Sequence, residues 1–140
     1  MEIPCACTTV RKANRALFRF YEAALEGSGL TITQFSILRA LSRNGPTPLT
    51  ALADELVMER TSLYRTIAPL QASGAIEIKA GGRGREKVAA LTAQGEARIA
   101  AALPAWETAQ SRVVSAIGAQ RWAEMSALLL DIPEMLETRP

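Results

Sequence analysis

The feature of the sequence that most restricts its fold is a predicted β-hairpin in the second half of the chain. Residues 76–79 and 87–91 have the composition of short strands, and three glycines stand in the stretch between them, Ala80-Gly81-Gly82-Arg83-Gly84-Arg85. Glycine clusters between strand-like segments mark turns, because glycine adopts the left-handed backbone conformations that turns require. We therefore predict a hairpin with a flexible, basic tip, around which the other elements must pack.

Four helices are predicted before this hairpin. Apolar residues recur there at spacings of three and four, which places them on one face of a helix. The first helix is expected to start at a capping threonine, either Thr8 or Thr9. The third is expected to start at Thr47, with Pro48 in its first turn. The predicted helices cover residues 8 to 27 or 29, 33–43, 47–56 and 59–72.

The third and fourth helices are separated by a predicted turn at Val57-Met58. The fourth helix is expected to turn Leu63, Ile67 and Leu70 toward the core and to end at Ser73-Gly74. Helix, turn, helix and hairpin, in this order, form the layout of a winged helix-turn-helix. With 140 residues, of which 49% are hydrophobic, the chain is predicted to form one mainly α-helical domain.

Two further helices are predicted after the hairpin. Thr92 is expected to cap the fifth, which reaches about residue 117 and is kinked near Pro104. The sixth begins at about residue 120, after Gly118 interrupts the chain. Its apolar residues, which the spacing places inward, are Trp122, Met125, Leu128, Leu129 and Ile132.

The composition argues against several classes of protein. The chain has no histidine, which removes the commonest general base and the commonest nitrogen ligand of zinc. Its two cysteines, Cys5 and Cys7, are too few for a disulfide framework or a four-ligand zinc site. No apolar run reaches ~18 residues and no signal-peptide core is present, which favours a cytoplasmic protein. We therefore predict no enzymatic activity, no metal, no cofactor and no membrane contact.

Charge is unevenly distributed along the chain. The net charge is only +2, but residues 60–87 carry six basic and two acidic side chains, a local net charge of +4. Residues 88–140 carry four basic and six acidic ones, a local net charge of −2. A local basic block of this kind is the electrostatic footprint of a surface that binds nucleic acid.

The start of the fourth helix supplies the predicted DNA-reading side chains. In a helix-turn-helix, the N-terminal part of the second helix meets the base edges in the major groove. Arginine can hold a guanine edge with two hydrogen bonds, and hydroxyl groups serve bases or phosphates. The outward residues predicted to contact the major groove are Arg60, Thr61, Ser62, Tyr64 and Arg65.

Basic residues of the hairpin are expected to contact the neighbouring minor groove. They are Arg83, Arg85 and Lys87. Each signal also has an ordinary explanation, because a polar helix face is often only solvated and hairpin charges often keep a strand edge soluble. The order of helix, turn, charged helix and basic hairpin favours duplex DNA as the partner.

Four stretches of the sequence resemble the MarR family of transcription regulators. Residues 30–38, Leu-Thr-Ile-Thr-Gln-Phe-Ser-Ile-Leu, resemble the family's second helix, and residues 52–56, Leu-Ala-Asp-Glu-Leu, the first helix of its DNA-reading pair. Residues 58–65 with Pro69-Leu70 are similar to its recognition helix. Residues 85–95 resemble the second wing strand and the leucine-threonine-x-x-glycine start of the fifth helix.

The resemblance implies a homodimer that represses nearby genes. Residues 1–29 and 93–140 would form the helical dimerisation region, and residues 30–92 the DNA-binding lobe. A dimer of this kind binds a pseudo-palindromic site whose half-site centres lie one helical turn, ~34 Å, apart. Many members release DNA when a small, often phenolic, ligand or an oxidant arrives.

The chain departs from the family at Arg83. Members usually carry an aspartate two positions before the wing arginine, where its carboxylate braces that arginine. In this chain the brace is lost and a positive charge is gained. The attraction of the wing to phosphate is therefore expected to rise.

Cys5 and Cys7 are candidates for an oxidant sensor. They lie just before a predicted helix start and near Arg11 and Lys12, a setting that lowers the pKa of a thiol. Such a cysteine can form a sulfenic acid or a disulfide across a dimer. The alternative is a frayed N-terminus whose cysteines have no role.

A small-molecule effector is the other candidate signal. The resemblance implies a ligand pocket between the first helix and the DNA-binding lobe. Aromatic residues that can line such a pocket are Phe18, Phe20, Tyr21, Trp106 and Trp122. Aromatic residues at helical spacing belong more often to a core or an interface, which is the alternative reading.

The alternative function is a winged-helix dimer that binds proteins and no specific DNA.

Overall fold

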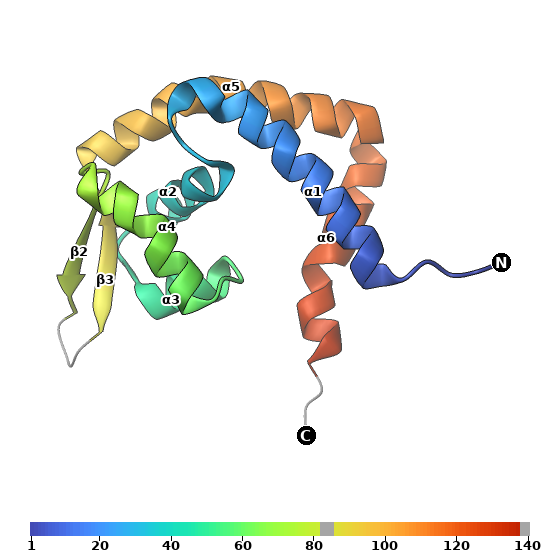
Figure 1. Ribbon diagram of the computed structural model, residues 1–140, viewed down its shortest axis with the longest axis horizontal. Helices are drawn as coiled ribbons and strands as arrows, with labels where there is room; N and C mark the ends of the chain where they lie inside the picture. Colours follow the sequence, from blue (N-terminus) through green and yellow to red (C-terminus); the bar gives the residue numbers. More distant parts are fainter. Residues whose placement is uncertain (82–85, 138–140) are drawn as a thin grey trace. The chain divides into compact units, whose positions relative to one another are not determined.

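The computed structural model describes residues 1–81 and 86–137, which form a mainly helical chain with a small sheet (Figure 1). In chain order the elements are α1 (Ala6–Leu25), the 3-10 helix η1 (Glu26–Ser28), α2 (Ile32–Asn44), β1 (Thr47–Pro48), α3 (Leu49–Glu55), α4 (Arg60–Ala72), β2 (Ile76–Ala80), β3 (Lys87–Leu91), α5 (Ala93–Ile117) and α6 (Ala119–Leu136). The chain divides into two compact units, Met1–Trp106 and Glu107–Pro140. The predicted fold class, a winged helix-turn-helix with further helices, is confirmed.

The start of α1 differs from the prediction. The helix begins at Ala6 with Cys5 in the N-cap position, so neither Thr8 nor Thr9 caps it. Both threonines lie inside the first turns, because the backbone of Cys5 already accepts a hydrogen bond from the N–H of Thr9 at 2.9 Å. Threonine is only a moderate cap, so its side chain does not decide where a helix begins.

Helix α2 starts with a reciprocal cap. The hydroxyl of Thr31 accepts a hydrogen bond from the backbone N–H of Gln34 at 3.0 Å, and the Gln34 side chain accepts one from the N–H of Thr31 at 3.1 Å. This capping box satisfies two of the N–H groups that a helix start leaves without partners. The helix therefore begins one residue before the predicted Thr33.

The prediction that Thr47 caps a helix is wrong. Thr47 and Pro48 form the short strand β1, which pairs with Ala89 and Val88 of β3. Proline has no N–H to donate and is tolerated at the edge of a sheet, where one side of the strand needs no partner. Among the described residues the strand order is β1-β3-β2, with both neighbouring pairs antiparallel.

The helix-turn-helix follows the sequence pattern closely. Leu63, Ile67 and Leu70 are each at most 2% exposed, as the helical spacing predicts. The turn between α3 and α4 passes through Val57, whose φ of 52° lies in the left-handed region. Gly74, with φ of 81°, ends α4 and leads into β2 beside it (Figure 1).

The start of α5 is tied to the backbone before β2. Thr92 caps the helix as predicted, because its hydroxyl oxygen accepts a hydrogen bond from the N–H of Gly95 at 3.1 Å. The same hydroxyl lies 2.6 Å from the carbonyl oxygen of Gly74 and 3.0 Å from that of Ala75. Gly95 packs against the same segment so closely that a Cβ would lie 2.2 Å from the Ala75 oxygen.

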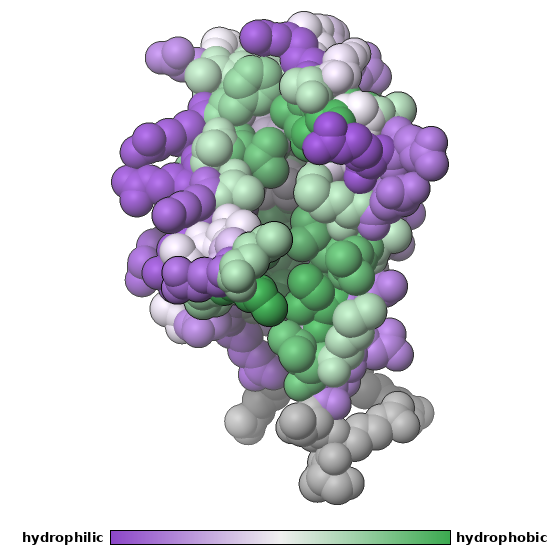
Figure 2. Space-filling model, turned by 90° about the vertical axis from the view of Figure 1, so that its right-hand side faces the viewer, coloured by the Kyte–Doolittle hydropathy of each residue, from purple (hydrophilic) through white to green (hydrophobic). Residues whose placement is uncertain are grey.

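The second unit places its apolar side chains at the surface. No residue of α6 is buried, and Leu128 and Leu130 are 57% and 79% exposed. Met125, Leu128 and Leu129, which the spacing places inward, are exposed within this single chain, and their burial against a second copy stays a prediction. Figure 2 shows hydrophobic side chains gathered on the face that it presents. In the part of the chain that the structure describes, no helix is long and apolar enough to cross a membrane.

Replacing Gly95 by alanine is expected to lower the free energy of unfolding by about 1–3 kcal/mol, because the added methyl group overlaps the Ala75 carbonyl and the Leu91 side chain. Urea denaturation followed by circular dichroism measures the change. Gly27→Ala is the matched control, since a Cβ at Gly27 meets no atom within 4 Å. Equal stability of the Gly95→Ala and wild-type proteins would contradict this close packing.

Candidate functional site

The outward face of α4 carries the side chains that the sequence analysis selected. Leu63 points into the core, with 1% of its surface exposed. Because the helix turns by 100° per residue, the neighbours of Leu63 face away from that core. The exposed residues are Arg60, Thr61, Ser62, Tyr64 and Arg65. The structure therefore brings all five predicted major-groove residues to one accessible helix start.

Arg60 and Arg65 are the cations of this helix start, and no ion pair joins either of them to another described residue. The first turn of α4, all of which the structure describes, contains no acidic residue. The carboxylate of Glu55, at the end of α3, accepts hydrogen bonds from Asn44 at 2.6 Å and Arg43 at 3.4 Å, and the exposed Glu59 stands in the N-cap position just before Arg60. Both arginines are free to meet an external anion.

The predicted wing is the hairpin of β2 and β3. Arg83 and Arg85 lie outside the described residues, so the structure places only Lys87 of the three predicted wing cations. Lys87 pairs with Ala80 at the outer end of the ladder. Side chains alternate along a strand, so Lys87 shares its face with Ala89, which is fully buried. This face of the hairpin is turned toward α4.

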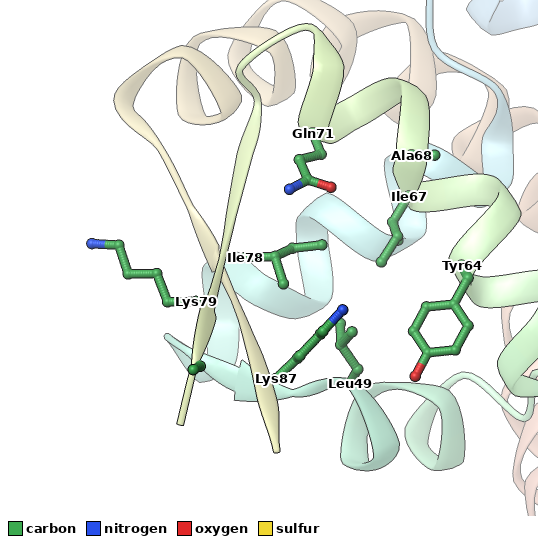
Figure 3. Close-up of a pocket in the computed structure, with 9 residues that line it drawn as sticks. Leu49, Tyr64, Ile67, Ala68, Gln71, Ile78, Lys79 and Lys87 are labelled. Carbon is green, nitrogen blue, oxygen red and sulfur yellow. The ribbon is translucent and has the colours of Figure 1, made fainter. Parts of the chain in front are cut away.

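A groove separates α4 from the hairpin, and we call it the α4–hairpin groove (Figure 3). Its volume is about 320 Å³. Tyr64 and Lys87 point into the space between the two elements, whereas the Lys79 side chain extends to the other side of the hairpin. The groove is lined by Leu49, Tyr64, Ile67, Ala68, Gln71, Ile78, Lys79, Ala80 and Lys87.

The sequence analysis named Tyr64 and Lys87 but not the groove that joins them. Two sequence signals point to it once they are combined. Tyr64, Ala68 and Gln71 follow each other at helical spacing, and Ile78 alternates with outward residues of β2. Neither pattern shows that this face of α4 and this face of β2 are turned toward each other, because that depends on how the hairpin packs on α4.

The N-terminal cysteines lie together at the start of α1. Both thiols are exposed, and a guanidinium nitrogen of Arg11 lies 3.8 Å from the Cys7 sulfur. The backbone N–H of Thr8, followed by the Thr8 hydroxyl and the N–H of Cys7, lowers the pKa of the Cys5 thiol. A lower pKa raises the fraction of nucleophilic thiolate at neutral pH.

Several of the predicted pocket aromatics make contacts inside the first unit. Trp106 packs against Phe35 with ring centroids 5.9 Å apart, and the Arg39 guanidinium lies 5.3 Å from the Trp106 ring. Phe20 and Tyr21 meet edge to face at 5.9 Å, and burial raises the pKa of Tyr21. A ligand pocket lined by these aromatics stays a prediction. Among residues 1–81 and 86–137, no group of three or more acidic or cysteine side chains is placed to hold a metal ion.

Comparison with known proteins identifies regulators of transcription. A model of the MarR family matches residues 28–86. The structure is similar to that of the Mycobacterium tuberculosis transcriptional regulator MosR in complex with DNA, with a TM-score of 0.86 and 34% sequence identity, covering 96% of this chain and 97% of MosR. The search of curated protein sequences found no match.

More distant structures share the fold. The transcriptional repressor CouR bound to a 23-mer DNA duplex has a TM-score of 0.83 at 20% identity, covering 95% of this chain and 99% of CouR. The regulator BpsR of Bordetella bronchiseptica has a TM-score of 0.80 at 19% identity, covering 93% of this chain and 94% of BpsR. The matched proteins are regulators, which agrees with the prediction that the chain is not an enzyme.

Cys5 is expected to react with iodoacetamide at a lower pH than a free cysteine does, because its thiolate forms below the usual pKa. The alkylation rate of a Cys7→Ser protein, measured between pH 5 and 10 at ~1-unit steps, reports Cys5 alone. A further Thr8→Val substitution removes one hydroxyl donor and is expected to move the midpoint to higher pH. A midpoint that matches free cysteine in both proteins would refute the assignment.

Proposed function

Because the chain belongs to the MarR family of transcriptional regulators, we propose that it is a repressor that binds a pseudo-palindromic DNA site as a homodimer. The observation that carries the proposal is the start of α4, where exposed Arg60 and Arg65 have no ion pair among the described residues, on the helix that lines a groove together with the hairpin. A regulator needs such a surface, because base edges are read by side chains that are free to reach them.

The proposed contacts divide by role. Arg60 and Arg65 reach guanine edges in the major groove, and the hydroxyl groups of Thr61, Ser62 and Tyr64 serve bases or phosphates. The hairpin follows the adjacent minor groove through Lys87 and the two arginines of its tip, Arg83 and Arg85. Base contacts set the sequence preference, while phosphate contacts set the position of the protein on the duplex.

A homodimer is supported by the apolar surface of α6. Leu128, Leu130 and Leu136 are 57%, 79% and 73% exposed, although leucine gains free energy by leaving water. A second copy supplies the same surface, so the two can cover each other around a twofold axis. Such a dimer matches a palindrome, because each half-site meets the same recognition helix.

An oxidant is the proposed signal for release, with Cys5 as its first target. The Cys5 thiolate attacks the O–O bond of a peroxide, which takes one proton and leaves as water or an alcohol while the sulfur becomes a sulfenic acid. A second thiol, that of Cys7 or of the partner copy, then displaces water to form a disulfide. The lowered pKa of Cys5 and the Arg11 guanidinium beside Cys7 support this assignment.

A small organic ligand is the alternative signal. The DNA binding of the distant neighbour BpsR is regulated by 6-hydroxynicotinic acid. The aromatic residues of α1 and α5 are the proposed lining of a corresponding site in this chain.

The protein is expected to bind DNA from upstream of its own gene more tightly than an unrelated duplex. If six to eight phosphates are contacted, log affinity should fall with log salt concentration at a slope of about −5 to −7. Fluorescence anisotropy at several salt concentrations measures both quantities. Arg60→Ala and Arg65→Ala should each weaken specific binding by about tenfold or more, whereas Arg15→Ala on the exposed face of α1 should not.

Equal, weak binding to both duplexes and to a pool of random sequences would contradict the proposal. The chain would then be a winged-helix dimer that binds proteins, the alternative that the sequence analysis left open.

Peroxide is expected to weaken DNA binding of the reduced protein, and a thiol reductant should restore it. Anisotropy titrations before and after treatment measure the loss. The double variant Cys5→Ser, Cys7→Ser is the control, since its affinity for DNA should equal that of the reduced wild type and should not change with peroxide. A double variant that loses DNA binding as the wild type does would rule out the cysteine switch.

A further inference from the structure

We propose that the α4–hairpin groove is a seat for one backbone phosphate of the DNA strand that separates the major groove from the minor groove, with Lys87 and Tyr64 as its ligands. This inference rests on the proposed function, and it adds a defined phosphate-binding subsite to it. The groove lies between two elements that enter different grooves of the duplex. Its position and its lining both point to this occupant.

The position follows from the shape of B-form DNA. A recognition helix occupies the major groove and a wing the adjacent minor groove. The two grooves are separated by one sugar-phosphate strand, so that strand must pass between helix and wing. In this chain the space between α4 and the hairpin is the groove of about 320 Å³ that Figure 3 shows.

The polar groups of the groove suit a phosphodiester. The Lys87 ammonium enters from the hairpin and Tyr64 from α4, so a phosphate between them meets a charged donor and a hydroxyl donor (Figure 3). Among the described residues Lys87 has no ion pair. Its neighbour Glu86 accepts a hydrogen bond from the Thr50 hydroxyl of α3 at 3.3 Å.

The apolar part of the lining suits the sugar. Leu49 and Ile67, which are 4% and 2% exposed, line the floor of the groove and belong to the core beneath it, and the half-buried Ile78 adds an apolar wall from β2. Deoxyribose presents C–H groups beside each phosphate. The apolar lining can therefore pack against the sugar while the Lys87 ammonium and the Tyr64 hydroxyl bind the phosphate oxygens. The groove thus offers partners for both parts of a nucleotide backbone unit, the phosphate oxygens and the C–H face of the sugar.

The two ligands come from different elements, and this gives the seat a second effect. A phosphate bound to both Tyr64 and Lys87 holds α4 at a fixed distance from the hairpin. Arg60 and Arg65 then meet the bases at a fixed register, because they stand on the same helix as Tyr64. The seat is thus a positioning device, and its loss should weaken binding to all sequences alike.

The experiment is a double-mutant cycle between protein and DNA. A set of operator duplexes is prepared, each with one neutral methylphosphonate in place of a backbone phosphate. Wild type, Lys87→Met and Tyr64→Phe are titrated against the set by fluorescence anisotropy. On unmodified DNA, Lys87→Met is expected to weaken binding about tenfold and to reduce the salt slope by about 1.

One duplex in each half-site should behave differently. Where the methylphosphonate replaces the phosphate bound in the groove, the wild type has already lost the interaction. On that duplex Lys87→Met and Tyr64→Phe should therefore bind almost as tightly as the wild type does. Lys79→Met is the matched control: it removes a lysine of the same hairpin whose ammonium lies 3.5 Å from the Glu77 carboxylate on the other side. Lys79→Met should weaken DNA binding far less than Lys87→Met does. Its effect should be the same wherever the methylphosphonate stands in the duplex.

Two results would overturn the inference. If Lys87→Met weakens binding by the same factor on every modified duplex, no single phosphate sits in the groove, although the proposed function stands. The same holds if Lys79→Met matches Lys87→Met throughout. If the wild type prefers no duplex at all, the proposed function fails, and the phosphate seat fails with it.

Discussion

The packing of the first turn of α5 against the backbone of Gly74 and Ala75 holds the helix-turn-helix and the hairpin together. The Ala75 carbonyl accepts a hydrogen bond from the Thr92 N–H at 3.1 Å and lies where any side chain at Gly95 would collide with it. One turn later, Arg98 donates to the Ser73 hydroxyl at 3.1 Å and to the Gly29 carbonyl at 3.3 Å. The end of α4, the start of β2 and the junction before α2 are therefore all held by the first two turns of α5.

Local patterns predicted the elements that depend on local forces. The apolar spacing of α4 gave its buried face correctly, since a helix with one apolar stripe can bury it only one way. The strand pair and the cap at Thr92 were also predicted, because turn glycines and capping hydroxyls act over a few residues. Thr47 was misassigned because its strand exists only through pairing with Ala89, a contact that no local pattern encodes.

The same distinction explains the candidate site. Exposed cations on α4 follow from the position of Leu63 alone, so the sequence predicts them. The groove with Tyr64 and Lys87 forms because one face of α4 packs beside one face of the hairpin. The periodicity of each element does not predict this tertiary contact. For α6, periodicity identified the apolar face but not what covers it, so residues predicted inward, such as Leu128, are exposed in the single chain.

Electrostatic arrangement, and not net charge, suits this lobe to an anion. At physiological ionic strength charges act over ~8 Å, so the overall charge of +2 has little bearing on binding. Three carboxylates of this unit have polar partners of their own: Glu55 with Asn44, Glu86 with Thr50, and Glu77 with Lys79. Exposed cations on α4 and on the hairpin can offer positive charge to an anion from two elements, which the net charge of the chain alone does not indicate.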